Sequence, residues 1–201
     1  MIRRFFEKCL KQKILLGLVF LMNISCVKNV EEGIELKPSV KEDKPYYESY
    51  VLHTRQKVVI KDFEKKFSVV ATYMSKNFVT SLMERYKNLF KVNETPLEDV
   101  NGKLAFFVSF STPDREYVDM ANKKLWRVFS TIDGNNIEPV VLKKIKEKER
   151  WQAFYPEITP WSHEYLVIFD HLVPATAGDS ADNLGVEFLL AGTEAEIKML
   201  W

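Results

Sequence analysis

The three histidines are the first residues to test for chemistry, because imidazole is the commonest protein ligand of transition metals. They are His53, His163 and His171. No two of them stand at a ligand spacing such as His-x-x-x-His, and a strand carrying both His163 and His171 would hold them about 26 Å apart. The sequence therefore predicts no metal site, and it has no glycine-rich phosphate motif that would indicate a nucleotide cofactor.

Only one segment gives a weak indication of a hydroxyl nucleophile. The chain has no Gly-x-Ser-x-Gly motif. The tripeptide Gly178-Asp179-Ser180 is similar to the nucleophile block of one esterase class, but that block normally follows the first strand of a parallel α/β fold. Asp182 and Asn183 add oxygens that suit calcium, without the glycine and the distal glutamate of a calcium loop. A hydrolase that uses residues 178–183 is the weakest of our three hypotheses, and we expect no catalytic residue.

One segment, residues 151–165, is rich in aromatic side chains and prolines. Aromatic faces stack on sugars and pack against peptides, so this segment is the candidate ligand surface. The alternative, which we favour, is a rigid loop whose rings fill one end of the domain. The exposure of Trp151 and Trp161 separates the two hypotheses. The four rings of the candidate surface are Trp151, Phe154, Tyr155 and Trp161.

The N-terminal 25 residues have the composition of a secretory signal peptide. Five basic residues and one acidic residue stand among the first thirteen, and an apolar run from Ile14 to Met22 follows. A basic start, a short apolar run and a small residue before the cut are typical of export signals. The run is too short to span a bilayer, which needs about 20 apolar residues.

The segment that ends in Ser25-Cys26 resembles the lipobox of bacterial lipoproteins, in which the peptidase cuts before a cysteine that is then acylated. Asn23 departs from that pattern, since the family usually has leucine there. The resemblance implies lipidation of Cys26 and attachment of the protein to a membrane. Val27 and Lys28, rather than aspartate, follow the cysteine. This implies an outer-membrane location facing the periplasm if the cell is Gram-negative.

Cysteine usage and charge agree with this interpretation. The only other cysteine, Cys9, lies in the leader, so the mature domain would have neither a free thiol nor a disulfide. Removing residues 1–25 changes 29 basic and 28 acidic residues to 24 and 27, a net charge of −3. A weakly acidic domain argues against nucleic acid as a partner, and also against electrostatic docking on anionic lipid.

The sequence divides into three parts. Residues 1–25 are the expected signal peptide, residues 26–46 the lipidated cysteine with a flexible tether, and residues 47–201 a β-rich domain. The tether is predicted from its dense charge and its two prolines, Pro38 and Pro45. The 155 residues that follow are enough for one domain with a sizeable core.

Short alternating segments separated by turns predict mainly strands. One helix is predicted from Ser75, which can cap it, through Phe90, because apolar residues between them keep one face of a 3.6-residue period. Asp133-Gly134 predicts a tight hairpin. Pro139 places its strand at a sheet edge. The expected strands cover residues 49–60, 66–74, 104–110, 124–132, 137–143, 164–171, 184–190 and 195–201.

These elements suit a mainly β fold, an antiparallel β-sandwich of about eight strands with one packed α-helix. The alternative is an α+β fold with a single curved sheet over the helix. Residues 143–150 are densely charged, and we predict a solvated turn or a short helix there.

A further likeness extends over residues 50–170. Thr54-Arg55, the run from Ala71 to Ser75, Trp126, and Phe154-Tyr155-Pro156 with Trp161 and Tyr165 are similar to a set of uncharacterised bacterial lipoproteins. The likeness implies no activity. Our first hypothesis is therefore a lipid-anchored envelope protein that binds or scaffolds another envelope protein. The second hypothesis is a carbohydrate- or peptidoglycan-binding module that uses the four rings named above.

Overall fold

A computed structural model of the chain describes residues 39–92, 100, 102–172 and 185–201. In these ranges it has nine strands in two antiparallel sheets and three helices. The helices are α2 (Lys44–His53), α3 (Lys76–Phe90) and α4 (Lys148–Trp151). The strands are β1 (Thr54–Lys61), β2 (Glu64–Tyr73), β3 (Lys103–Ser111), β4 (Trp126–Ile132), β5 (Asn135–Ile137), β6 (Pro139–Lys144), β7 (His163–Leu172), β8 (Val186–Gly192) and β9 (Glu196–Leu200).

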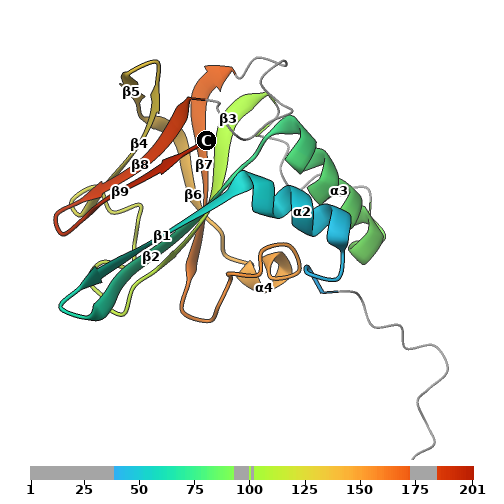
Figure 1. The fold of residues 1–201 in the computed structure, drawn as a ribbon, viewed down its shortest axis with the longest axis horizontal. Helices are drawn as coiled ribbons and strands as arrows, with labels where there is room; N and C mark the ends of the chain where they lie inside the picture. Colours follow the sequence, from blue (N-terminus) through green and yellow to red (C-terminus); the bar gives the residue numbers. More distant parts are fainter. Residues whose placement is uncertain (1–38, 93–99, 101, 173–184) are drawn as a thin grey trace, which may run out of the picture. The chain divides into compact units, whose positions relative to one another are not determined.

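The two sheets form a β-sandwich-like arrangement. The larger sheet has the order β1-β2-β3-β7-β6, and the smaller one has the order β5-β4-β8-β9. Figure 1 shows the sheets packed against each other, with the helices on the outer side of the larger sheet. The prediction of a mainly β sandwich is confirmed, and the alternative of a single curved sheet is wrong.

The core between the sheets follows from alternation along the strands. In β2 the buried side chains Phe67, Val69, Ala71 and Tyr73 point to the smaller sheet, because successive strand residues face opposite sides. Strands β3 and β7 are buried on both faces. They lie at the centre of the larger sheet, where the second face is covered by helices.

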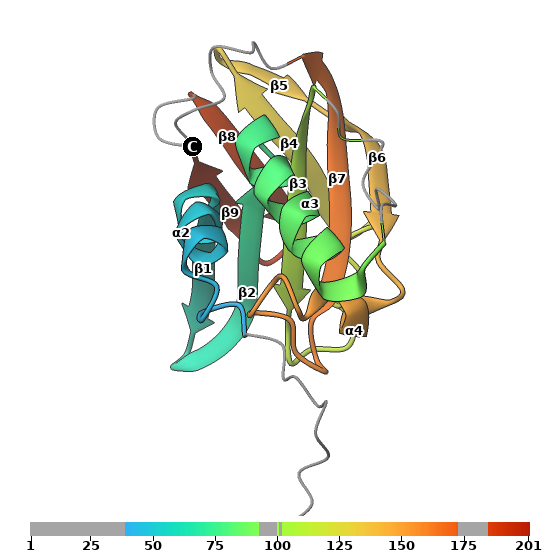
Figure 2. The ribbon, with the colours of Figure 1, turned by 90° about the vertical axis from the view of Figure 1, so that its right-hand side faces the viewer.

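A second core lies between the larger sheet and the helices. Helix α3 begins as predicted: the Ser75 hydroxyl accepts a hydrogen bond from the Phe78 amide at 3.0 Å. Its apolar face contributes the buried Phe78, Leu82 and Tyr86. Figure 2 shows α3 lying across the sheet. The helix is therefore a cover for the strands, as its stripe predicts.

The predicted tether and first strand are wrong at their junction. Residues 44–53 form helix α2, and the first strand begins only at Thr54. Pro45 stands at the start of the helix, where its missing amide hydrogen costs nothing. One face of the helix is buried and carries Tyr46, Tyr50 and His53. Their spacing of four and then three residues is helical, but the charged residues around them make this period hard to recognise in the sequence.

The chain before this helix is also part of the domain. Val40 is buried, and Asp43 forms an ion pair with Arg85 of α3, with 2.5 Å between Oδ2 and Nη1. The folded unit thus includes at least residues 39–46, which the composition assigned to the tether. Residues 1–38, with the expected signal peptide and Cys26, lie outside the described residues.

A second correction concerns the Asp133-Gly134 turn. The hairpin exists, but its return strand β5 spans only Asn135–Ile137. Strand β6 follows at once and pairs with β7 in the other sheet. The predicted strand 137–143 therefore splits at Glu138, where the chain crosses between the sheets. Strand β6 is the outer strand of its sheet, so the edge position predicted from Pro139 is confirmed.

The final strand pair is also confirmed. Strands β8 and β9 are antiparallel neighbours, and Trp201 is almost fully buried.

Among the described residues, no helix combines the length and the apolar character needed to cross a bilayer.

Candidate functional site

A cavity of about 310 Å³ opens at one end of the sandwich, and we call it the end cavity. Three segments that are distant in sequence build it: the β1–β2 hairpin, the chain just after β3, and the β8–β9 turn. Its size lies at the lower end of the range for small-molecule sites. The lining residues are Val59, Lys61, Asp62, Lys66, Phe67, Thr112, Asp114, Tyr117 and Glu194.

Aromatic rings form the inner part of the end cavity. Phe67 is buried, and its ring packs edge-on against Trp126 at 5.1 Å between centroids. Tyr117 packs edge-on against Phe67 at 5.8 Å, and its carbonyl oxygen accepts a hydrogen bond from the Trp126 indole at 3.0 Å. The Tyr117 ring is therefore held in place before any ligand arrives.

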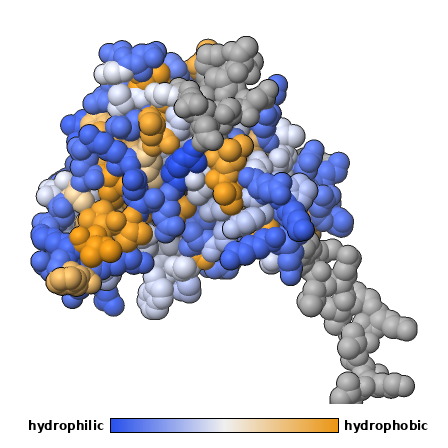
Figure 3. All heavy atoms as spheres, in the orientation of Figure 1, coloured by the Kyte–Doolittle hydropathy of each residue, from blue (hydrophilic) through white to orange (hydrophobic). Residues whose placement is uncertain are grey.

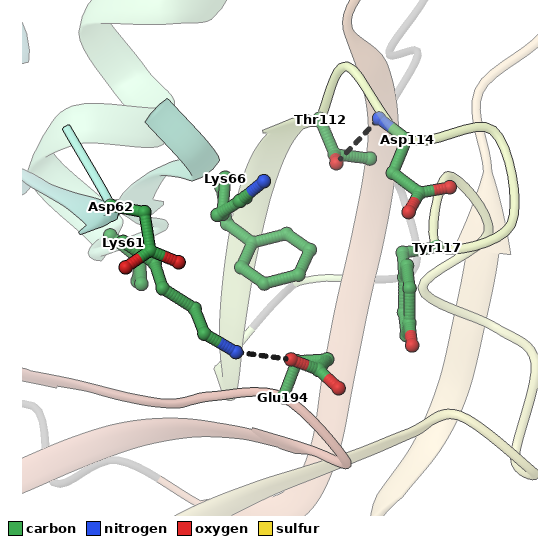
Figure 4. Close-up of a pocket in the computed structure, with 9 residues that line it drawn as sticks. Lys61, Asp62, Lys66, Thr112, Asp114, Tyr117 and Glu194 are labelled. Atoms are coloured by element: carbon green, nitrogen blue, oxygen red, sulfur yellow. Dashed lines mark hydrogen bonds and ion pairs between the residues drawn. The ribbon is translucent and has the colours of Figure 1, made fainter. Parts of the chain in front are cut away.

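Charged groups of both signs surround these rings. Lys61 on β1 reaches Glu194 in the β8–β9 turn, with 3.2 Å between Nζ and Oε2, so that this ion pair joins the two sheets at the mouth (Figure 4). Asp114 is fixed by its own turn, since its amide donates to the Thr112 hydroxyl at 3.2 Å. The cavity thus presents the ammonium groups of Lys61 and Lys66 beside three carboxylates.

The ammonium group of Lys66 stays charged across the physiological range. A hydrogen bond to the Glu64 carboxylate at 2.9 Å raises the pKa of Lys66, and the charges of Asp62 and Asp114 act in the same direction. The same contact lowers the pKa of Glu64. The cavity can therefore pair with an anionic group and a cationic group of one ligand at the same time.

A second cavity of about 490 Å³ lies between β4 and β6, where the two sheets separate. Its lining is mostly apolar, and Arg127 and Glu138 pair with each other across it. This pairing occupies two of its three charged groups, whereas the end cavity has Asp62 and Asp114 in addition to its Lys61–Glu194 pair and to Lys66, which pairs with Glu64. The end cavity offers more convergent polar groups, and it is the better candidate site.

The predicted aromatic surface is wrong for three of its four rings. Trp151, Phe154 and Tyr155 are buried in the core between the larger sheet and the helices. Tyr155 stacks on Phe107 of β3 with 3.8 Å between ring centroids. These three rings are packed inside the core and present no exposed face, so they do not form the sugar-binding platform. Only Trp161 is exposed, at 80%.

The other residues considered for chemistry lie in different parts of the chain. Residues 178–183, the weak nucleophile and calcium signal, lie outside the described residues, as does Cys26. His53 is buried and contacts Ser75, with 2.8 Å between Nε2 and Oγ. Among the described residues, no three histidine, cysteine or acidic side chains gather as a metal site would require.

The sequence interpretation missed two glutamates, the partly buried Glu157 and the buried Glu164. Glu157 accepts a hydrogen bond from the Tyr50 hydroxyl at 2.7 Å, and Glu164 accepts one from the Ser162 hydroxyl at 2.5 Å. The second oxygen of each group is buried and has no hydrogen-bond partner among the described residues. Burial raises the pKa of Glu157 to about 7 and also raises the pKa of Glu164. Glu164 directly precedes the apolar run at residues 165–169 of β7, and this position was the signal that could have identified it.

The end cavity had no signal of this kind. Its charged residues stand in turns or near the ends of strands, where charge is ordinary, and only the folding of three distant segments brings them together. Comparison with known proteins finds no matching family model, no matching curated protein and no matching solved structure.

Proposed function

We propose that this chain is a lipid-anchored protein of the cell envelope that works by binding, with the end cavity as its ligand site. The observation that carries the binding role is the convergence of two ammonium groups and three carboxylates around the preformed Phe67 and Tyr117 rings. Such a site suits a small zwitterionic ligand, for example a short peptide with free termini. The anchor is inferred from the lipobox-like segment that ends at Cys26.

The binding role is tested by a nuclear magnetic resonance titration of the protein with the dipeptide alanyl-alanine, with N-acetylglucosamine as a neutral comparator. We expect saturable shifts of the amide signals of Lys66, Thr112 and Tyr117 with the dipeptide alone. Lys66→Ala should weaken them, whereas Lys124→Ala, an exposed lysine outside the cavity lining, should not. Shifts that do not saturate with either probe would reject the end cavity as a zwitterion site.

The anchor is tested in the native host by mass analysis of the mature protein. We expect an acylated N-terminal Cys26, and a Cys26→Ala protein that moves from the membrane fraction to the soluble fraction. A wild-type protein with an unmodified Cys26 thiol and an intact leader would contradict this part of the proposal.

A further inference from the structure

The tip of the β1–β2 hairpin presents an aromatic ring in an unusual way. Phe63 is fully exposed, and it stands at φ 63° in the two-residue turn Asp62-Phe63. Left-handed backbone of this kind favours glycine or asparagine in hairpin turns and is unfavourable for a bulky side chain. The chain thus accepts both backbone strain and apolar exposure at this position, a combination that indicates a contact surface.

A second exposed ring lies on a turn that is held rigidly. The Lys148 ammonium donates hydrogen bonds to the carbonyl oxygens of Thr159, Pro160 and Ser162 at 3.1, 2.8 and 3.2 Å. The Thr159 amide also donates to the Ser162 hydroxyl at 2.8 Å. Trp161 stands inside this turn and remains 80% exposed. The turn orders the indole without covering it.

Both turns belong to the same end of the domain. In Figures 1 and 2 the β1–β2 turn and the segment between α4 and β7 lie at the lower end, and the described chain also begins there, ahead of α2. Figure 3 shows apolar residues gathered over the β1–β2 hairpin on an otherwise mostly hydrophilic face. Exposed Val58 and Ile60 of β1 continue this apolar surface from Phe63.

We propose that this end of the domain rests on a lipid bilayer, with the Phe63 and Trp161 rings in the headgroup layer. Aromatic rings favour the membrane interface, where an apolar body meets water. Lys65 stands next to the hairpin tip, and Lys57 stands further along β1, opposite Val69. Lysines can extend their ammonium groups to lipid phosphates while their stems follow the apolar surface. Rings rather than charge supply most of this contact, which fits the weakly acidic composition of the domain.

The position of the anchor supports the bilayer as occupant. Only twelve residues separate Cys26 from the first described residue, Ser39. A chain of this length spans at most about 45 Å when fully extended. Because the described chain begins at the end that carries Phe63 and Trp161, a lipid on Cys26 would keep this end nearest the membrane. In this respect the inference rests on the proposed function. The end cavity would then take its ligand from the membrane surface.

A second copy of the chain is the competing occupant. Strand β1 is the outer strand of its sheet, and such strands can pair with another chain. Exposed lysines along β1 and its turn, Lys57 and Lys61 among them, oppose such pairing. We therefore assign the surface to lipid and make dimerisation an outcome of the test.

The test uses the full chain with Cys9→Ser and Cys26→Ser, so that acylation plays no part. Single cysteines then replace Phe63, Trp161 or Leu172 and carry an environment-sensitive fluorophore. Leu172 is the matched control, because it is apolar and 75% exposed but ends β7 at the opposite end of the domain. The leader is common to all three proteins and cannot account for a difference between the probes.

Vesicles of phosphatidylcholine and phosphatidylglycerol in equal parts should shift the probe emission at positions 63 and 161 to shorter wavelength. Brominated lipids should quench both probes, and the probe at position 172 should not change. In the unsubstituted chain, brominated lipids should quench the exposed Trp161, and Trp161→Phe should abolish that quenching, because Trp126, Trp151 and Trp201 are buried.

Equal responses of the three probes, or none at positions 63 and 161, would overturn the inference. Protection of both probes in a dimer without vesicles would assign the surface to a second copy instead. Since the test needs neither acylation nor the zwitterionic probe, its failure is distinguishable from failure of the proposed function.

Discussion

The indole nitrogen of Trp201 donates a hydrogen bond to the backbone carbonyl oxygen of His53, with 2.8 Å between Nε1 and O. Trp201 directly follows β9 of the smaller sheet, and His53 ends α2 in the helical layer. The Trp201 ring also packs on Phe106 of the larger sheet, at 5.0 Å between centroids. One side chain therefore connects all three layers of the domain.

Trp201→Ala should lower the free energy of unfolding by about 3–5 kcal/mol, because it removes a large buried ring and leaves a cavity. Urea denaturation monitored by circular dichroism measures the change. Leu200→Ala is the matched control, since the adjacent Leu200 is 63% exposed and its truncation should change stability by less than about 0.5 kcal/mol. Similar losses in the two variants would show that Trp201 does not connect the layers as described.

The cap of α3 gives a smaller prediction. The Ser75 hydroxyl accepts from the Phe78 amide and also contacts His53, so it joins the start of α3 to the end of α2. Ser75→Ala should reduce the free energy of unfolding by about 1–2 kcal/mol. Ser75→Thr keeps the hydroxyl and should recover most of the loss in thermal denaturation. If threonine and alanine were equally destabilising, packing rather than the hydrogen bond would be responsible.

How far the sequence predicts this fold depends on whether a signal is local. The stripe of α3, the Asp133-Gly134 turn and the edge position of Pro139 rest on neighbouring residues, and all three are confirmed. Helix α2 was missed because its apolar face consists of Tyr46, Tyr50 and His53, residue types that also occur in strands.

The candidate site depends on distant contacts, which a single sequence does not display. Trp151 and Phe154 looked available for a ligand, but the residues that bury them come from α3 and β3, more than 40 residues earlier in the chain. The end cavity likewise joins β1 to Glu194, which is over 130 residues away. Its lining residues come from strands and turns and carry no motif that could have identified it.

The free energy of unfolding should depend on pH through Glu157. Its pKa is about 7 in the folded protein and near 4.5 in the unfolded chain, so the folded state binds more protons between these values. The contribution of Glu157 to the free energy of unfolding should therefore be most favourable below about pH 4.5. It should fall by about 3 kcal/mol in total as the pH rises through 7.

Urea titrations between pH 5 and 8 measure this loss. Glu157→Gln keeps an acceptor for the Tyr50 hydroxyl and removes the titration, so its stability should vary less over the same range. Glu164, whose pKa is also raised, remains in both proteins and contributes a shared slope. Parallel pH profiles for the two proteins would show that Glu157 does not carry the raised pKa.

Gly192 lies directly opposite Trp126 in the β4–β8 ladder, and the indole ring occupies the space where a side chain would stand. A Cβ atom at position 192 would lie 2.2 Å from Cζ3 and 2.4 Å from Cε3 of Trp126. The ring cannot move away easily, because Phe67 and Phe110 pack against it at 5.1 and 5.4 Å between centroids. Gly192→Ala should therefore destabilise the domain by about 1–3 kcal/mol or more.

Thermal denaturation of Gly192→Ala and of Gly134→Ala separates this clash from backbone strain. Gly134 has φ +79° and open space around it, so its substitution adds only the left-handed backbone penalty of about 1–2 kcal/mol. Combining Gly192→Ala with Trp126→Phe should cost less than the sum of the single changes, because the smaller ring makes room for the methyl group. Strict additivity would mean that the Trp126 ring does not fill the space above Gly192.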